Sequence, residues 1–189
     1  MGQIRKWLES GFSACVIGEG CFVTLDDVNM LPPDAFVETF GSIYEHSSWV
    51  AEAAVDERPF VRQSDLIQHM RESVNEASNA EKLSLLRAHP ELAGKAAIDG
   101  TLTQASQEEQ ASAGLDRMLP TEFSALTQMN AAYNTKFGFP FIICVRLTNK
   151  AGILEALENR LKNTIEEEFE TALGEVHKIA ELRLEGVLS

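Results

Sequence analysis

The sequence is short of basic residues and of long hydrophobic runs. It carries 16 Lys and Arg against 29 Asp and Glu in 189 residues, which gives a formal net charge of -13 at pH 7. Proteins attract polyanions through Lys and Arg, so no nucleic-acid partner is expected, and a helix-turn-helix DNA regulator is disfavoured. No apolar stretch approaches the roughly 18 residues that span a bilayer, so no membrane partner is expected either. A local arginine can still hold a small anion in such an acidic protein.

Signatures of metal, phosphate and nucleophile chemistry are also missing. His46, His69 and His177 have no partner at metal-ligand spacing, so no metal site is expected. There is no glycine-rich phosphate loop after a strand, and no Gly-x-Ser-x-Gly elbow. The sequence has 3 cysteines, an odd number without ligand spacing, and Cys144 lies in an apolar run where a thiol is more often core than nucleophile. Reduced cysteines of this kind predict an intracellular, cytoplasmic protein.

The remaining pattern is helical. A chain of 189 residues with 44% hydrophobic residues can bury one sizeable core. Residues 1–23 contain glycines and no helical period, and they predict an irregular N-terminal extension. From residue 24 onward, caps and breaks alternate with apolar faces of helical period. The sequence therefore predicts an all-α fold over residues 24–189, a single-domain bundle of about eight helices.

The helix starts are marked by capping residues. Thr24, Ser78 and Thr164 each precede an acid three residues later, which is the capping-box pattern. Asp34 is expected to cap a helix that fades near residue 47, Ser64 and Thr121 are expected to cap later helices, and further starts are expected near residues 49, 103 and 150. Residues 137–145 form a near-continuous apolar run bounded by Gly and Pro. The run must be buried, but its periodicity leaves open whether it is extended or helical.

His89 stands where a proline stops the helix that begins at Ser78. The residue before a proline is pushed out of the helical region, so this helix should end at or just before His89. Histidine can give or take a proton near neutral pH. A terminal histidine can also simply interact with the helix dipole. Its surroundings in sequence do not distinguish the two interpretations.

Arg183 lies in the middle of an otherwise apolar stripe on the final helix. The stripe comprises Ile165, Phe169, Ala172, Leu173, Val176, Ala180 and Val187. An arginine at this position either forms a buried structural salt bridge or presents its guanidinium to a ligand carboxylate. Both interpretations stay open at this point.

Ser106, Glu109 and Gln110 share one face of the helix expected over residues 103–113, because positions three and four apart are neighbours. The face could line a cleft. Ser106 with Glu109 also matches a capping box, which would give the two residues a purely structural role. Gln107 and Glu108 lie on other faces and serve as internal controls.

Three separated motifs together resemble a known family. They are His89-Pro90-Glu91-Leu92-Ala93-Gly94, then Ser106-x-x-Glu109-Gln110-x-x-Ala113-Gly114-Leu115, then Phe137-Gly138-Phe139-Pro140-Phe141-Ile142-Ile143-Cys144-Val145-Arg146. In this order they are similar to the OHCU decarboxylases, which convert 2-oxo-4-hydroxy-4-carboxy-5-ureidoimidazoline to (S)-allantoin in urate breakdown. The resemblance covers about residues 24–188 and implies an all-helical enzyme that needs no cofactor, acts on this small-molecule substrate and is commonly a homodimer.

The resemblance also assigns roles to residues. It implies that His89 is the catalytic histidine, with Glu109 beside it. Ser106 and Gln110 would bond the ureido or ring amides of the substrate, and Arg183 would hold an oxygen-bearing group. Pro90 would fix the approach to His89. Backbone groups around Phe139, Phe141 and Ile142 would complete the pocket.

The implied chemistry suits these residue types. Decarboxylation leaves an electron pair that most decarboxylases pass to a cofactor. In this substrate a ring C=N bond can accept the pair, so no metal or cofactor is required. His89 would handle the proton of the 4-hydroxyl or the proton added to one face of the carbanion, and the sequence leaves open whether His89 or Glu109 is the final donor. The competing interpretation is a non-catalytic all-α protein that binds a small anion or a partner, in which Glu109 and Arg183 pair directly.

Overall fold

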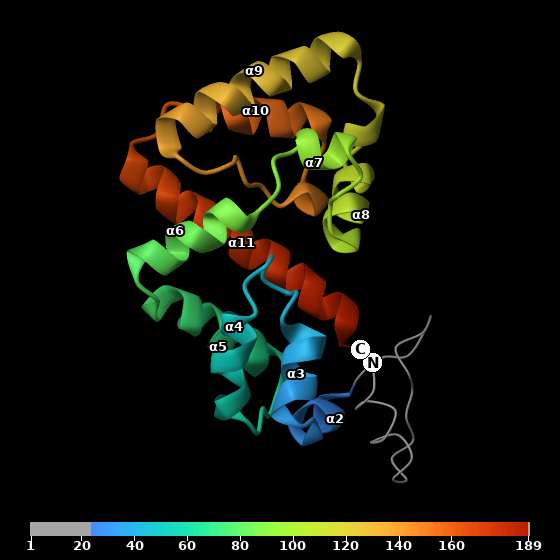
Figure 1. Ribbon diagram of the computed structural model, residues 1–189, viewed down its shortest axis with the longest axis vertical. Helices are drawn as coiled ribbons and strands as arrows, with labels where there is room; N and C mark the ends of the chain where they lie inside the picture. The colour runs from blue at the N-terminus through green and yellow to red at the C-terminus, as the bar shows by residue number, and fades with distance from the viewer. Residues whose placement is uncertain (1–23, 189) are drawn as a thin grey trace.

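The long helix α11, Ile165–Val187, is the element against which much of the fold packs. The computed structural model describes residues 24–188, and within them α11 contacts α5, α6 and α9. In Figure 1, α11 runs diagonally between an end formed by α2 to α5 and an end formed by α9 and α10, with α8 beside its C-terminal half. Its buried side chains include Ala172, Leu173, Val176 and Ala180, so the predicted stripe is largely confirmed. Ile165, in the first turn, is an exception at 57% exposed.

The all-α prediction is confirmed in one compact domain. Residues 24–188 contain ten α-helices and three short 3-10 helices, which position the pocket described below. They are α2 (Leu25–Met30), α3 (Pro33–Phe40), α4 (Trp49–Ala54), η1 (Val55–Glu57), α5 (Gln63–Glu76), α6 (Asn79–Ala88), α7 (Lys95–Ile98), α8 (Gln104–Ser112), η2 (Leu115–Arg117), α9 (Pro120–Phe137), η3 (Val145–Leu147), α10 (Lys150–Arg160) and α11.

The irregular extension predicted over residues 1–23 lies outside the described residues. Among the described helices, none is both long and apolar enough to cross a membrane.

The capping boxes predicted at Thr24, Ser78 and Thr164 are confirmed, each with both reciprocal hydrogen bonds. The predicted caps at Asp34 and Thr121 are wrong. Each falls one residue inside its helix, because a proline occupies the first helical position, where its fixed φ suits the helix and its missing N–H costs nothing. Neither helix therefore has an N-cap side chain that accepts from its first turn, although Glu122 of α9 accepts from the Leu119 N–H at 2.8 Å.

Two other boundaries also differ from expectation. Helix α5 begins at Gln63, so Ser64 is inside the helix and Arg62 is the N-cap residue. Helix α3 ends at Phe40 instead of near residue 47. Residues 41–48 form turns instead, with His46 in the left-handed region at φ 49°. These turns carry a glutamate, Glu45, into the interior of the protein.

The apolar run predicted to be buried is buried, but residues 139–144 form neither a helix nor a strand. Phe139 and Phe141 pack edge-on against Tyr133 of α9, with ring centroids 5.9 and 5.3 Å away. Phe137 completes the cluster at 4.6 Å from Tyr133. The segment crosses beneath α9 and α10 in Figure 1. Its residues Phe141, Ile142 and Ile143 form one wall of the pocket described below.

Candidate active site

His89 occupies the C-cap of α6, as the proline predicts. Its backbone leaves the helical region, with φ -72° and ψ 138°, and its side chain is buried at 8% exposed. The ring Nδ1 lies 3.0 Å from the Leu85 carbonyl oxygen. A carbonyl oxygen can only accept, so Nδ1 carries the proton and donates it. In the neutral ring Nε2 is then the acceptor, and His89 can take a proton there.

Burial lowers the pKa of His89 to about 4. The hydrogen bond to Leu85 and the negative charge of Glu45 oppose this shift, and the positive charge of Arg183 adds to it. The ring is therefore neutral at pH 7. It is suited to act first as a base.

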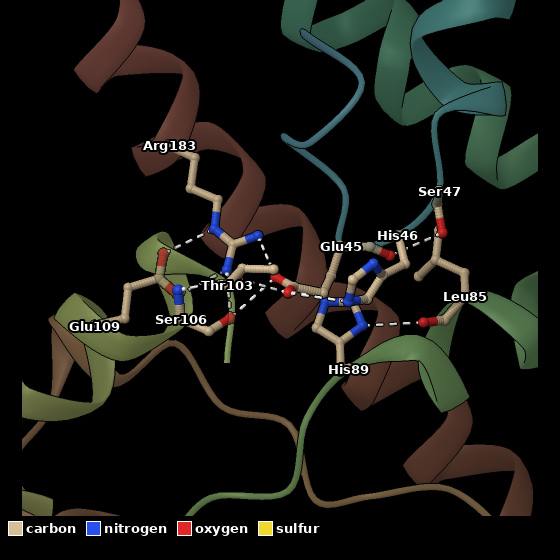
Figure 2. Close-up of polar contacts among 9 residues, drawn as sticks. All are labelled: Glu45, His46, Ser47, Leu85, His89, Thr103, Ser106, Glu109 and Arg183. Carbon is tan, nitrogen blue, oxygen red and sulfur yellow. Dashed lines mark hydrogen bonds and ion pairs between the residues drawn. The ribbon is translucent and has the colours of Figure 1, made fainter. Parts of the chain in front are cut away.

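Arg183 of α11 is held by two carboxylates, as Figure 2 shows. Its Nε and Nη2 atoms donate to the two oxygens of Glu109, both at 2.8 Å, in a bidentate pair. Its Nη1 donates to Glu45 at 2.7 Å. The side chains of Arg183, Glu109 and Glu45 are 8%, 13% and 2% exposed. Arg183 thus fixes Glu109 on α8 relative to the loop that carries Glu45.

Glu45 is the member of this cluster that the sequence did not identify. It accepts hydrogen bonds from the hydroxyls of Thr103 at 2.8 Å and Ser106 at 3.0 Å, besides Arg183. Ser106 in turn accepts from Arg183 Nη2 at 3.2 Å. Ser106 therefore links Glu45 to Arg183 in this structure, which is a different role from the predicted hydrogen bond to a ligand amide. No spacing or pattern around Glu45 marks it.

The contacts within the cluster keep Glu45 and Arg183 charged despite their burial. Burial by itself would raise the pKa of Glu45, but Arg183 and the hydrogen bonds from Thr103 and Ser106 outweigh it and hold that pKa below its usual value. Burial would likewise lower the pKa of Arg183, and Glu109 and Glu45 raise it instead. The two carboxylates and one guanidinium leave one net negative charge beside a neutral His89.

Gln110 has its amide orientation fixed by the backbone. Its Oε1 accepts from the Ala93 N–H at 3.0 Å, and the side chain is buried at 6% exposed. Ala93 itself lies in the left-handed region, at φ 50°. The Gln110 NH₂ group is left as the end that can donate to a ligand oxygen.

One pocket brings most of the predicted site residues together. It encloses about 360 Å³ of empty space, part of it open to solvent. It is lined by His89, Pro90, Leu92, Ser106, Glu109, Gln110, Phe141, Ile142, Ile143, Val145, Ile179 and Arg183. Phe139, predicted to contact a ligand, is not among the lining residues, because its ring packs into the aromatic cluster with Tyr133 and Phe137. Leu92, Ile143 and Val145 lie within the predicted motifs but had no predicted role, and Ile179 lies outside the motifs.

The pocket combines a base, a carboxylate held by an arginine, an amide donor and an apolar wall. Glu109 and Arg183 do pair directly, but the pair leaves an open pocket instead of filling it. Within residues 24–188, no group of three or more His, Cys, Asp or Glu side chains could hold a metal ion. The geometry suits proton transfer on a small polar ligand.

Sequence comparison finds relatives over most of the chain. The profile of the family described as OHCU decarboxylase matches residues 29–185, which include Glu45, His89, Glu109 and Arg183. The 2-oxo-4-hydroxy-4-carboxy-5-ureidoimidazoline decarboxylase of Haloferax volcanii is 45% identical over 162 residues, covering 86% of this chain and 94% of the relative. The Xenopus laevis protein of the same name is 38% identical over 160 residues, covering 85% and 91%.

Two solved structures are similar in fold. A crystal structure of (S)-allantoin synthase superposes with a TM-score of 0.72 at 35% identity, covering 88% of this chain and 54% of that one, so this chain spans about half of its length. A crystal structure of OHCU decarboxylase in the presence of (S)-allantoin superposes with a TM-score of 0.61 at 27% identity, covering 75% of this chain and 92% of that one.

Proposed function

The chain belongs to the OHCU decarboxylase family, and we propose that it converts 2-oxo-4-hydroxy-4-carboxy-5-ureidoimidazoline to (S)-allantoin and carbon dioxide without a cofactor. It is a decarboxylase, a carboxy-lyase of urate degradation. The observation that carries the residue assignment is a single one. His89, with Nε2 as its acceptor, lines the same pocket as the Glu109 carboxylate that Arg183 holds.

The reaction breaks the bond between ring carbon 4 and its carboxylate. The electron pair forms a double bond between carbons 4 and 5, and the pair of the adjacent C=N bond moves onto nitrogen. The product then forms when the 4-hydroxyl loses its proton and carbon 5 and the ring nitrogen each gain one. One proton net comes from solvent. The ring itself is the electron sink, so the protein has to orient the substrate and manage protons.

His89 is assigned as the base that takes the 4-hydroxyl proton. Its neutral ring with a free Nε2 supports this order, because the residue must accept a proton before it can donate one. Return of the proton from one side of the ring to carbon 5 would set the S configuration. Pro90 ends the helix and holds His89 at the pocket.

Glu109 and Arg183 are assigned to orient and polarise the substrate. Arg183 has four N–H donors committed to Glu109, Glu45 and Ser106, so it contributes mainly by holding Glu109, with one Nη1 proton left for a substrate oxygen. The Glu109 carboxylate accepts from ureido or ring N–H groups. The Gln110 amide donates to a carbonyl oxygen, and Phe141 and Ile142 form the apolar wall.

The assignment of His89 is tested with substrate generated in situ from urate. We expect the wild-type enzyme to yield (S)-allantoin faster than the spontaneous racemising route. His89→Ala should lower kcat by about 100-fold or more, the usual contribution of a general base, and should lower the enantiomeric excess. Wild-type rate and enantiomeric excess in this variant would refute the assignment.

Glu109 has a matched control one residue away. Glu109→Gln should lower kcat/KM strongly, because it breaks the bidentate pair with Arg183. Glu108→Gln alters an exposed acid on another face of the same helix, which hydrogen-bonds only Gln104, and should leave kcat/KM within about twofold of wild type. Equal effects of the two changes would exclude a specific role for Glu109.

The family resemblance extends the proposal to a cytoplasmic homodimer. Sedimentation equilibrium should give about twice the chain mass of 20.8 kDa. A monomer at micromolar concentration would contradict the proposed homodimer.

The proposed cofactor independence predicts that kcat is unchanged after exhaustive dialysis against EDTA. Loss of activity that is restored by added metal would contradict it.

A further inference from the structure

A second buried polar cluster lies outside the pocket, around Glu168 of α11. Glu168 is 0% exposed. One carboxylate oxygen accepts from Arg160 Nε at 2.8 Å, from Arg160 Nη2 at 2.5 Å and from the Tyr133 hydroxyl. The other accepts from the Asn163 amide at 2.7 Å. The carboxylate is thus fully hydrogen-bonded by three neighbouring side chains.

The ion pair between Arg160 and Glu168 is not explained by its contribution to stability alone. Desolvating two charges costs free energy that their attraction seldom exceeds, and apolar residues of similar volume are often as stabilising. The pair does something that apolar residues could not do. The remaining arm of the guanidinium, Nη1, donates to the Ile142 carbonyl oxygen at 2.7 Å. The guanidinium carbon also lies 4.6 Å from the centroid of the Phe141 ring.

Both residues that Arg160 touches belong to the pocket wall. Phe141 and Ile142 line the pocket, in a segment with no helix or strand to fix its backbone. In a planar trans peptide the C=O and the next N–H point in opposite directions. Holding the Ile142 carbonyl against Arg160 therefore directs the Ile143 N–H away from Arg160. Ile143 also lines the pocket.

The Ile143 N–H has no acceptor among residues 24–188. Ile143 is partly exposed beside the pocket, so its unpaired N–H can be reached by a ligand. The next N–H, of Cys144, is already taken by the Glu175 carboxylate at 2.8 Å. The Phe141 and Ile142 N–H groups also have no acceptor among the described residues, but the Ile143 N–H is the open donor whose peptide plane a side chain holds, through Arg160 and the Ile142 carbonyl.

We propose that Arg160, held by Glu168, is a positioning residue that fixes the 142–143 peptide so that the Ile143 N–H donates a hydrogen bond to the substrate oxygen on carbon 4, which gains negative charge as it loses its proton and is a carbonyl oxygen in allantoin. This inference rests on the proposed function and adds to it the group that meets the negative charge of the substrate. Such a donor is useful here because the Glu45, Glu109 and Arg183 cluster carries a net negative charge. Only a planar guanidinium can bind Glu168 through two arms and Ile142 through the third, so lysine cannot replace it.

A titration of the wild-type protein with (S)-allantoin tests the donor directly. With ¹⁵N labelling, we expect the Ile143 backbone amide and the Gln110 side-chain amide both to shift. A shift of Gln110 without any change at Ile143 would overturn the inference and leave the proposed function standing. If neither amide shifts while the wild-type enzyme is inactive, the proposed function has failed.

Kinetics of two variants separate positioning from stability. Arg160→Lys removes the contact to Ile142, whereas Tyr133→Phe removes a hydrogen bond to the same buried carboxylate and leaves that contact in place. Loss of an oxyanion donor typically costs 100-fold or more, and a displaced donor costs less, so Arg160→Lys should lower kcat roughly tenfold with little change in KM. Tyr133→Phe should lose thermal stability but keep kcat within about twofold.

The kinetic comparison is made at a temperature where circular dichroism shows both variants folded. Equal kcat in the two variants would mean that Arg160 is only structural and would overturn the inference. If Arg160→Lys does not fold, the wild-type titration decides, because it needs no variant.

Discussion

At the scale of single residues, Glu45 is the clearest case of a role created by the fold. The chain has 29 acidic residues, and such residues are mostly exposed, so the sequence does not distinguish Glu45 from the other acidic residues. Glu45 is buried because α3 ends at Phe40 and the following turns, with His46 in a left-handed conformation, lead inward. Its partners Thr103 and Arg183 are 58 and 138 residues away in the chain. No local pattern contains that information.

Arg183 shows the opposite case. An arginine in an apolar stripe predicted either a buried salt bridge or a ligand contact, and the structure contains the salt bridge on the wall of a pocket. The side chain therefore forms the salt bridge and also lines the pocket. The sequence located the residue correctly, but its partners had to come from other elements.

We predict that Glu45→Gln destabilises the protein by about 3–5 kcal/mol, because it removes one partner of a buried ion pair. All three groups that reach Glu45 are donors, and the NH₂ of a glutamine would meet at least one of them. Urea unfolding would measure the free energy, and kcat should fall as Arg183 and Glu109 shift.

Glu52→Gln is the matched control for this change. Glu52 is an exposed acid nearby on α4 that hydrogen-bonds Ser48 at 2.9 Å. Its replacement should change the free energy of unfolding by less than about 0.5 kcal/mol. If Glu45→Gln proves as mild as this control, Glu45 does not organise the site.

At the scale of elements, α8 carries most of the site. The capping-box interpretation of Ser106 and Glu109 is wrong, because Thr103 is the N-cap and its hydroxyl accepts from the Ser106 N–H. The shared face of Ser106, Glu109 and Gln110 is confirmed, since all three line the pocket. The helical period places these three residues on one face of α8. The contacts to Arg183 of α11 and to the loop that carries Glu45 determine which groups that face meets.

Thr103 has two roles that can be separated by comparison with Thr24. Both are threonine N-caps, and removing either hydroxyl should cost about 1 kcal/mol. Thr103 also donates to Glu45 at 2.8 Å. We therefore expect Thr103→Ala to lower kcat/KM several-fold and Thr24→Ala to leave kcat/KM unchanged. Steady-state kinetics would measure this, and thermal melts of both variants would compare their losses of stability. Identical kinetics in the two variants would show that the Thr103 contact to Glu45 is unimportant.

Helix boundaries were predicted well where a side chain caps the helix, and also at the start of α4 at Trp49 and at the proline that ends α6. The boxes at Thr24, Ser78 and Thr164 form within four residues and depend on nothing else, so local sequence suffices. Helices α3 and α9 begin at prolines instead. The early end of α3 follows from the packing of residues 41–48. The hydrophobic periodicity of the sequence does not predict this packing.

At the scale of the whole molecule, two buried histidines link stability to pH. Burial lowers the pKa of both His89 and His177 to about 4, and nearby Arg71 and Lys82 contribute at His177. His177 also lies 2.9 Å from the Tyr44 hydroxyl and 3.3 Å from the Asn75 amide oxygen. The unfolded chain binds protons at these positions below pH 6.5, and the folded protein binds them only near pH 4.

Stability should therefore be complete above pH 6.5 and fall as the pH is lowered from 6.5 to 4. Each histidine contributes a slope of at most about 1.4 kcal/mol per pH unit. The carboxylates with lowered pKa, Glu45 among them, lose their contribution only below about pH 4.5, so the histidines act first. Urea unfolding at pH 7, 6 and 5 would measure this, and His177→Gln should reduce the slope. A free energy of unfolding that is constant from pH 7 to 5 would contradict the prediction.

The sequence by itself determined the all-α class, the helix stop at His89, the polar face of α8 and the unusual place of Arg183, because each depends on residues within a few turns of one another. Only the tertiary structure decided that Glu45 joins Arg183, that Phe139 turns away from the pocket and that Arg160 holds its wall. These depend on contacts between residues far apart in the chain, where burial and hydrogen-bond geometry, and not local spacing, select the partner.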